Sequence, residues 1–220
     1  TYKKETYKSF KQKRKFLLFS SIGKRDTRIQ AIDLWKKDKN RNFDIALYYY
    51  DKPPTKHCLD YCIYRKGTKF NNFYHFMSNH EISNYEAIWI VDDDIKMETD
   101  QINRMFDIFK EHNLDLAQPS YTENSLISHP MTKVDRNCKL RICNFVEVGA
   151  FLCSQKMINK CKDVFKTSIS ACGLDYICCH MINNGNNIAL IDETPCFHDD
   201  ITSSIDNVIA RDNHYKEAEE

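Results

Sequence analysis

A short apolar stretch that runs directly into three carboxylates constrains the fold of this chain more than any other feature. Residues 87–91 are apolar, and Asp92, Asp93 and Asp94 follow without a break. A run this short, rich in β-branched and aromatic residues, is typical of a strand that is buried on both faces. Ligands in open α/β sheets bind outside the carboxyl ends of the strands, which is where these carboxylates would lie.

Three adjacent carboxylates repel one another, so a folded protein keeps them together most readily when a cation or hydrogen-bond donors neutralise them. Oxygen ligands on a tight turn suit Mg²⁺ or Mn²⁺, and these ions commonly bridge to phosphate oxygens. The alternative is a solvated acidic turn that caps a helix beginning near Thr99. The triplet by itself does not separate the two interpretations.

Strands and helices alternate along the first half of the chain. This order predicts an α/β fold with a mainly parallel central sheet and helices on both faces. Residues 121–137 are polar and lack periodicity, as expected of a surface loop that could cover a site. The predicted strands cover residues 16–23, 43–51, 87–91, 114–120, 144–153 and 188–192, with a short one near 63–64, and the predicted helices cover 29–35, 68–80, 99–109, 154–165 and 174–182.

Groups that bind phosphate or nucleoside are expected where the first two strands end. The first strand leads into Ser20, Ser21 and Gly23, then Arg25, before a helix begins, and a helix N-terminus suits a phosphate. The spacing matches neither a Walker loop nor G-x-G-x-x-G, so this turn is a weak signal by itself. Asp51 ends the second strand, where it either accepts hydrogen bonds from a ribose or base or simply begins a turn.

Four further residues are candidates for the same site. Lys69 opens a predicted helix and is placed to meet phosphates. Glu147 lies inside a predicted strand, where a buried carboxylate is costly without a partner, and Gly149 would let a ligand approach closely. A structural hydrogen bond to a neighbouring loop is the alternative role for Glu147. Asp175 begins a helix, where the helix dipole favours an acid, so capping is its simplest role.

Composition excludes some classes of function. Lys and Arg number 32 against 31 Asp and Glu, which argues against a dedicated nucleic-acid binder. We expect residues 1–15 to form a basic N-terminal arm, residues 16–205 a single domain and residues 206–220 a charged tail. The arm mixes Lys with aromatic residues, so it is either solvated or in peripheral contact with an anionic membrane surface.

The ten cysteines lie mostly in apolar segments of a chain too long to need disulfide staples, so we expect buried reduced thiols in a cytoplasmic protein. A zinc site is the alternative, with Cys58 and Cys62 joining Cys178, Cys179 or His180, although the usual C-x-x-C pairs are missing. No run approaches the roughly 20 apolar residues of a membrane span, and no signal peptide is visible. The first residue is Thr rather than Met, which is consistent with a piece of a longer, multidomain chain.

Taken in order, the nucleotide-type first half, the acidic triplet, the polar loop, the Glu-bearing strand, the Gly-Leu-Asp helix start and a late His resemble the GT-A glycosyltransferase fold. Within it, the chain is similar to an uncharacterised glycosyltransferase family of plants and bacteria whose members carry an acidic W-D-x-D turn. The chain departs from this family at Val91 and Cys172, where Trp is usual, and at Asp199 and Asp200, where Gln-Gly is expected. The resemblance spans about residues 16–200 and rests on residues 85–94, 116–119, 146–147, 173–175 and His198.

The resemblance implies a D-x-D metal site. Asp92 and Asp94 would form the motif, with Asp94 directly on a Mn²⁺ or Mg²⁺ ion and His198 as a second ligand from the late loop. Asp92 would complete the ion site, or Asp92 or Asp93 would contact the ribose or a metal-bound water. Asp93 is the member of the triplet most expected to face solvent.

The resemblance also implies a reaction. Asp51 and the turn at residues 20–25 would face the nucleoside, while Asp175 would be the general base that takes a proton from the attacking sugar hydroxyl. Glu147 is the second catalytic candidate. This arrangement predicts inversion at the anomeric carbon, and retention is the alternative if Asp175 only caps its helix or binds the acceptor.

We therefore expect a metal-dependent glycosyltransferase that moves a sugar from a nucleotide-diphosphate donor, most simply a UDP-sugar, to a glycan or glycolipid acceptor in cell-surface polysaccharide synthesis. A sugar-phosphate nucleotidyltransferase shares the sheet and the acidic site, but its Gly-rich basic loop is reduced here to Gly23, Lys24 and Arg25. A non-catalytic glycan-binding domain of the same fold is the alternative from a different class.

Overall fold

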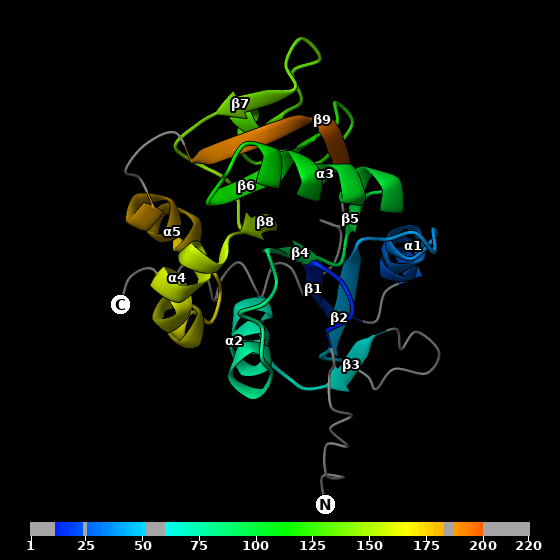
Figure 1. Ribbon diagram of the computed structural model, residues 1–220, viewed down its shortest axis with the longest axis vertical. Helices are drawn as coiled ribbons and strands as arrows, with labels where there is room; N and C mark the ends of the chain where they lie inside the picture. Colours follow the sequence, from blue (N-terminus) through cyan, green and yellow to red (C-terminus); the bar gives the residue numbers. More distant parts are fainter. Residues whose placement is uncertain (1–11, 24–25, 52–59, 183–186, 200–220) are drawn as a thin grey trace, which may run out of the picture.

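The computed structural model of the protein describes residues 12–23, 26–51, 60–182 and 187–199. Helices and strands alternate along these residues (Figure 1). The elements are β1 (Phe16–Ile22), α1 (Asp26–Trp35), β2 (Phe43–Tyr49), β3 (Tyr61–Tyr64), α2 (Lys69–Asn79), β4 (Ala87–Asp92), β5 (Ile95–Lys96), α3 (Thr99–Glu111), β6 (Leu116–Tyr121), η1 (Pro130–Thr132), β7 (Leu140–Ile142), β8 (Ala150–Cys153), α4 (Gln155–Thr167), α5 (Leu174–Ile182) and β9 (Ile188–His198).

One sheet joins the described strands in the order β3-β2-β1-β4-β8-β6-β9-β5, with β7 paired to β9. The first four strands pair in parallel, and helices α1 and α2 connect β1 to β2 and β3 to β4. In the second half, β8 runs antiparallel between β4 and β6, and β5 and β7 are antiparallel to β9. The α/β class and the parallel first half are confirmed, and the second half makes the sheet mixed.

Side chains on both faces of the sheet are buried. Along β4, Trp89 and Val91 belong to a core with α1 and α3, whereas Ile88 and Ile90 belong to a second core with α2, α4 and α5. Figure 1 shows these helices on opposite sides of the strands. Because both faces of β4 are covered by apolar side chains, its sequence is a continuous apolar run and does not alternate between apolar and polar residues.

Local sequence fixes where two of the helices begin. Ser154 lies at the N-cap of α4, and its Oγ accepts a hydrogen bond from the Met157 amide at 3.2 Å. Before α3, Glu98 and Gln101 form a capping box, in which Gln101 Oε1 accepts from the Glu98 amide at 3.1 Å. These caps agree with the helix starts expected from the sequence.

The strand register gathers several chain segments at one edge of the sheet. Ser21 at the end of β1 lies beside Asp92 at the end of β4, and Ile22 lies beside Tyr49 at the end of β2. Antiparallel β8 begins at this edge as well, because its Ala150 pairs with Val91. The polar residues that follow these strands therefore converge at one edge.

The strand expected over residues 144–153 is wrong for its first six residues. Only Ala150–Cys153 pair as β8, while Glu147 lies in an irregular segment before it. The Glu147 amide donates to Gln118 Oε1 at 2.5 Å, and Glu147 Oε1 accepts from the His129 amide at 3.1 Å. Hydrogen bonds with residues 118 and 129 thus take the place of the backbone pairing that a strand would have made here. The structure also adds β7 just after the polar region at residues 121–137 and extends the last strand to His198.

The cysteine expectation is wrong at one position. Cys62 is disulfide-bonded, whereas reduced thiols were expected throughout. Eight other cysteines are free: Cys138, Cys143, Cys153, Cys161, Cys172, Cys178, Cys179 and Cys196. Across the described residues, no three or more His, Cys, Asp or Glu side chains form a group that could hold a metal ion, which gives the zinc alternative no support. Cys58 lies outside the described residues.

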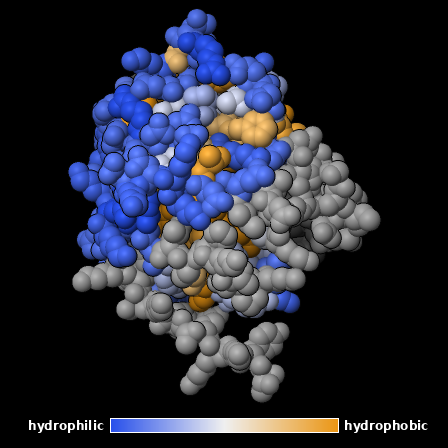
Figure 2. All heavy atoms as spheres, turned by 90° about the vertical axis from the view of Figure 1, so that its right-hand side faces the viewer, coloured by the Kyte–Doolittle hydropathy of each residue, from blue (hydrophilic) through white to orange (hydrophobic). Residues whose placement is uncertain are grey.

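The surface that Figure 2 shows is mostly hydrophilic where it is coloured, and hydrophobic side chains come to it only in small areas. Within the described ranges, no helix combines the length and the apolar character needed to span a bilayer.

A buried aspartate anchors the start of the domain to β2. Asp44 is fully buried, and its carboxylate accepts from the Lys13 amide, from Arg14 Nη1 and from the Tyr85 hydroxyl, each at 2.8 Å. Neighbouring Asp60 bonds Arg41 and the Ile45 amide; burial opposes its ionisation, but these partners outweigh that effect and lower its pKa. Residues 13–14 are therefore part of the domain, two residues inside the boundary expected for the basic arm.

Replacing Asp44 with Ala should lower the free energy of unfolding by about 3 kcal/mol, because it leaves the Arg14 guanidinium and the Tyr85 hydroxyl without their acceptor. Urea denaturation measures this loss. The control is Asp33→Ala, which removes a solvent-exposed ion pair with Lys36 and should cost less than about 1 kcal/mol. Equal losses in the two variants would contradict the anchoring role of Asp44.

Candidate active site

The acidic turn lies where β4 leaves the sheet. Asp92 is the last residue of β4, and its amide donates to the Gly149 carbonyl at 2.8 Å. Lys69 Nζ lies 2.7 Å from Asp92 Oδ1 and also donates to the Val148 carbonyl at 2.5 Å. Lys69 is the first residue of α2, so the start of this helix places the lysine ammonium beside the acidic turn. The side chain of Asp92 remains 41% exposed.

Asp93 points inward, so the expectation that it faces solvent is wrong. Only 6% of the residue is exposed, and its Oδ2 accepts a hydrogen bond from the Gly23 amide at 2.6 Å. The backbone just after β1 is therefore tied to the acidic turn. This bond gives Asp93 a structural role that its position in the triplet did not reveal.

Asp94 and His198 come together although β4 and β9 are far apart in sequence. Asp94 Oδ1 lies 3.7 Å from His198 Nε2, is buried, and has no hydrogen-bond partner among the described residues. His198 Nδ1 lies 3.0 Å from the Leu126 carbonyl, so this nitrogen carries the proton and donates. When the ring is neutral, Nε2 presents its lone pair toward Asp94, as it does in a histidine that binds a metal.

The pKa of Asp94 is raised above its ordinary value, first by burial and then by the neighbouring Asp92 charge. A buried carboxylate oxygen without a donor and a histidine lone pair are suitable ligands for Mn²⁺ or Mg²⁺. The chain alone assembles no trio of ligands among its described residues, and Asp92 pairs with Lys69. Asp94 and His198 thus fit an ion whose other ligands are water or a bound phosphate.

A clasp holds the late segment against the acidic turn. In the short pairing of β5 with β9, Ile95 lies opposite His198. The Asp199 amide donates to the Asp94 carbonyl at 3.3 Å, and Lys96 Nζ lies 2.7 Å from Asp199 Oδ2. Asp199 is one of the residues that departs from the family pattern, and here it positions the histidine that precedes it.

Two further buried carboxyls border this region. Burial raises the pKa of Glu147, which is 7% exposed, against the opposing charges of His129 and His198. Burial likewise raises the pKa of Asp175, against the hydrogen bond from the Tyr176 amide at 3.0 Å and the charges of His129 and Lys69. Because His129 influences both groups, the loop at residue 129 and the start of α5 lie close together.

Tyr121 is a residue that reading the sequence missed. Its hydroxyl is fully buried beside Glu147, whose raised pKa it opposes, and its ring packs against His198 with centroids 5.2 Å apart. A Cβ atom added at Gly149 would lie 3.0 Å from this hydroxyl and 3.4 Å from Asp92 Oδ2. Gly149 therefore keeps a space open between Tyr121 and the acidic turn. The only sequence signal was Gly149 itself.

The predicted nucleoside-facing residues are only partly gathered. Ser21 Oγ accepts from Asn72 Nδ2 at 3.2 Å, while Ser20 Oγ is buried without a hydrogen-bond partner among the described residues. Asp51 is exposed after β2, and Arg25 lies outside the described residues. The structure thus places Ser21 and Gly23 next to the acidic turn and leaves Asp51 on the surface.

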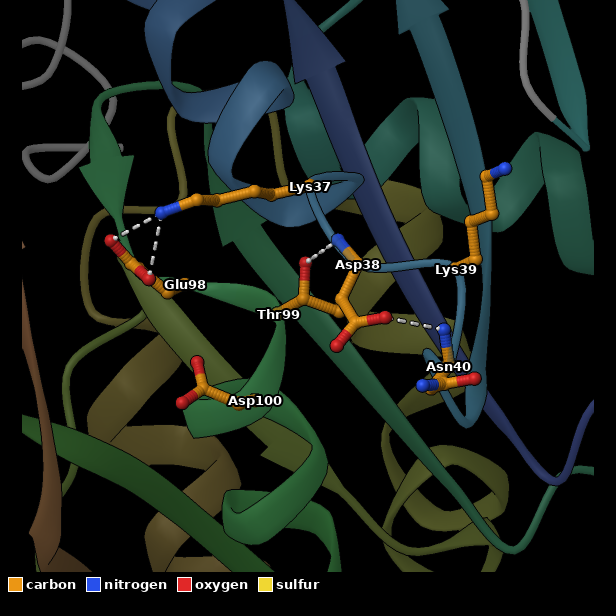
Figure 3. A pocket seen from close by; sticks show the side chains of 7 residues that line it. All are labelled: Lys37, Asp38, Lys39, Asn40, Glu98, Thr99 and Asp100. Carbon is orange, nitrogen blue, oxygen red and sulfur yellow. Dashed lines mark hydrogen bonds and ion pairs between the residues drawn. The ribbon is translucent and has the colours of Figure 1, made fainter.

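A hollow of about 670 Å³ lies elsewhere, between the loop after α1 and the start of α3 (Figure 3). Its polar groups bond one another: Lys37 Nζ lies 3.1 Å from Glu98 Oε1, and the Asp38 amide donates to Thr99 Oγ1 at 3.2 Å. None of the predicted site residues lines it. These bonds fit a structural junction between α1 and α3.

Known proteins resemble this chain at two levels. The family model described as "Protein of unknown function (DUF707)" matches residues 2–167. No curated protein matches the sequence.

Three crystal structures of S. aureus TarS share the fold. The structure described as S. aureus TarS matches with 10% identity and a TM-score of 0.57, and the match covers 83% of this chain and 36% of the TarS chain. TarS 1-349 matches with 12% identity, a TM-score of 0.57 and coverage of 83% and 59%. TarS 1-349 in complex with UDP-GlcNAc matches with 11% identity, a TM-score of 0.55 and coverage of 86% and 61%. The chain thus shares its α/β fold with TarS, and it spans less than two thirds of each TarS chain.

Replacing Asp94 with Asn should abolish stabilisation by Mn²⁺ while leaving the metal-free protein as stable or more so, because it removes a buried charge whose Oδ1 accepts no hydrogen bond among the described residues. Thermal unfolding with and without MnCl₂ measures both effects. Wild type should gain about 2.7 kcal/mol when Mn²⁺ is at 100 times its Kd.

Asp100→Asn is the matched control, because Asp100 is an exposed residue lining the separate hollow. It should retain the full response to Mn²⁺. A response of wild-type size in the Asp94 variant would remove Asp94 from the ion site.

Proposed function

The chain belongs to the family described as "Protein of unknown function (DUF707)", and we propose that it is a metal-dependent glycosyltransferase that transfers a sugar from a nucleotide-diphosphate donor to a glycan or glycolipid acceptor. The observation that carries the proposal is the buried Asp94 Oδ1, which accepts no hydrogen bond among the described residues and lies 3.7 Å from His198 Nε2. This pair lies at the end of β4, where α/β sheets bind ligands. The TarS structure that contains UDP-GlcNAc has the same fold, which supports UDP as the nucleotide to test first.

The proposed donor site combines one ion and one lysine. A Mn²⁺ or Mg²⁺ ion on Asp94 and His198 would neutralise the negative charge of the leaving diphosphate. The Lys69 ammonium, 11% exposed beside Asp92, supplies a second positive charge at the same edge. Asp92 offers its exposed oxygen to the ribose or to the ion. Ser21 and Gly23 approach the nucleoside from the end of β1.

In the proposed reaction, Asp175 is the general base. Its carboxylate takes the proton of the attacking acceptor hydroxyl as the oxygen bonds to the anomeric carbon, and the bond from that carbon to the diphosphate oxygen breaks with its electron pair on the diphosphate. A single displacement of this kind inverts the anomeric configuration. The raised pKa makes Asp175 a stronger base than an exposed aspartate, and burial keeps competing water away. Glu147 accepts a hydrogen bond from the His129 amide and is the second buried carboxylate near the proposed reaction.

This activity would suit synthesis of cell-surface polysaccharide, with the enzyme in the cytoplasm and its basic N-terminal arm in peripheral contact with the membrane. Most of that arm lies outside the described residues, as does the charged tail at 206–220. Vesicle binding by chains with and without residues 1–11 would test the membrane contact.

Binding of UDP should require both the ion and Asp94. Isothermal titration of UDP into wild type with MnCl₂ should give binding that weakens at least tenfold when EDTA replaces the metal, because the ion links the protein to the diphosphate. Asp94→Asn should show the weak binding in both buffers. Asp100→Asn should behave as wild type. Metal-independent UDP binding, unaltered in the Asp94 variant, would contradict the proposed site.

Replacing Asp175 with Asn should lower kcat by about 10²- to 10⁴-fold and leave the Kd for UDP unchanged, because general-base catalysis contributes on that scale. In wild type, kcat/KM should fall as the pH drops through the pKa of Asp175, at a higher pH than for an exposed aspartate, since only the ionised form accepts a proton. Release of UDP measures the rate, and NMR of the anomeric proton reads the stereochemistry. A retained configuration would assign Asp175 to another role.

A further inference from the structure

A second hollow, of about 350 Å³, opens beside the start of α5. Its walls include His129, Asn144, Phe145, Tyr176 and His180. Tyr176 directly follows the proposed base Asp175, and its amide donates to the Asp175 carboxylate. His129 also lines the hollow, and its amide donates to Glu147. The hollow therefore borders both buried carboxyls that face the proposed reaction.

Three rings line this hollow in a row. The ring centroids of His129 and Phe145 lie 4.7 Å apart, and those of Phe145 and Tyr176 lie 5.0 Å apart. Phe145 is buried in the middle, whereas Tyr176 is 61% exposed at the rim. The exposed Tyr176 ring packs against Phe145, so it offers a ligand a rigid apolar face and loses little conformational entropy on binding.

The charge of the lining restricts the occupant. No Lys, Arg, Asp or Glu side chain lines the hollow among the residues that the structure describes, although Asp175 and Glu147 lie just behind it. A phosphate or carboxylate would find no lysine or arginine in this lining, and ionised carboxyls nearby would repel it. The amide of Asn144 and the imidazoles of His129 and His180 can exchange hydrogen bonds with neutral hydroxyls.

We propose that this hollow is the acceptor subsite and that it takes a neutral pyranose ring, with one apolar face against Tyr176 and its hydroxyls toward Asn144 and His180. A volume of about 350 Å³ is at the small end of ligand sites, which suits a single ring better than a long oligosaccharide. A ring held here presents a hydroxyl toward Asp175, the residue next to Tyr176. The identity of this ring as the acceptor rests on the proposed transferase function.

Saturation-transfer NMR on the whole chain tests the subsite without requiring turnover. The probes are the methyl pyranosides of glucose and galactose, compared with methyl glucuronide and glucose 1-phosphate. The neutral glycosides should show saturation on their ring C–H protons, and the two anions should show at most a fifth of that signal. Equal signals from the anions would overturn the neutral-ring assignment.

Variants on one turn of α5 locate the binding. Tyr176→Ala should reduce the glycoside signal at least fivefold, whereas Tyr176→Phe keeps the ring and should stay within twofold of wild type. Ile177→Ala is the matched control, because Ile177 is 47% exposed on the same turn and does not line the hollow. All three keep the backbone bond to Asp175. Loss of signal in the Ile177 variant equal to that in Tyr176→Ala, or no signal in wild type, would overturn the proposal.

Two measurements keep this inference apart from the proposed function. If UDP fails to bind while the glycosides bind through Tyr176, the transferase proposal fails and the ring site stands as a binding site. If UDP binds with Mn²⁺ and the glycosides do not bind, the acceptor subsite lies elsewhere and the hollow loses its assignment.

Discussion

Three carboxylates side by side on one turn are the constraint on which the rest of this structure depends. Like charges at this spacing are stable in a fold only if each has its own partner. The chain supplies Lys69 for Asp92 and the Gly23 amide for Asp93, and it places His198 opposite Asp94. Each partner comes from a different element, so α2, β1 and β9 must all end or begin at the same edge of the sheet.

Asp92 and Asp93 have a different role from Asp94. Asp92 and Asp93 are engaged by the protein itself, and these contacts hold β1, α2 and β8 in place around the turn. Asp94 keeps an oxygen without a donor at the cost of a raised pKa. A fold rarely leaves a buried polar atom unsatisfied unless something else completes it. The same turn therefore serves both the architecture and the proposed chemistry.

Much of this could be predicted because the signals are local. The apolar run before Asp92 predicts a doubly buried strand, and the helical spacing of apolar residues predicts helices that begin within a residue or two of the observed starts of α3 and α4. The late His198 was chosen as a partner for Asp94 from the family resemblance, and the structure brings the two together. The strand and helix patterns depend on neighbouring residues and need no knowledge of distant contacts, whereas the pairing of His198 with Asp94 rests on the family resemblance.

The predictions that are wrong concern residues whose partners lie far away in the sequence. Glu147 was placed in a strand, yet its bonds come from Gln118 and His129, which lie 29 and 18 residues away. Asp93 was expected to face solvent, because nothing near it in sequence reveals the Gly23 amide. Tyr121 escaped notice because a buried hydroxyl near three carboxyls is visible only after folding. Long-range partners decide these positions, and a single sequence does not display them.

The clasp between β5 and β9 has a consequence for the order of events during synthesis. Contacts between distant segments form late, because a long loop must close before they can stabilise the fold. The strand pairing that sets Asp94 opposite His198 joins residues about a hundred positions apart, as the 103-residue separation of Lys96 and Asp199 illustrates. The parallel first half carries the acidic triplet without His198, the histidine ligand of the proposed site. Under that proposal, full metal affinity is acquired only with the last strand, so the ion stabilises finished molecules more than truncated ones.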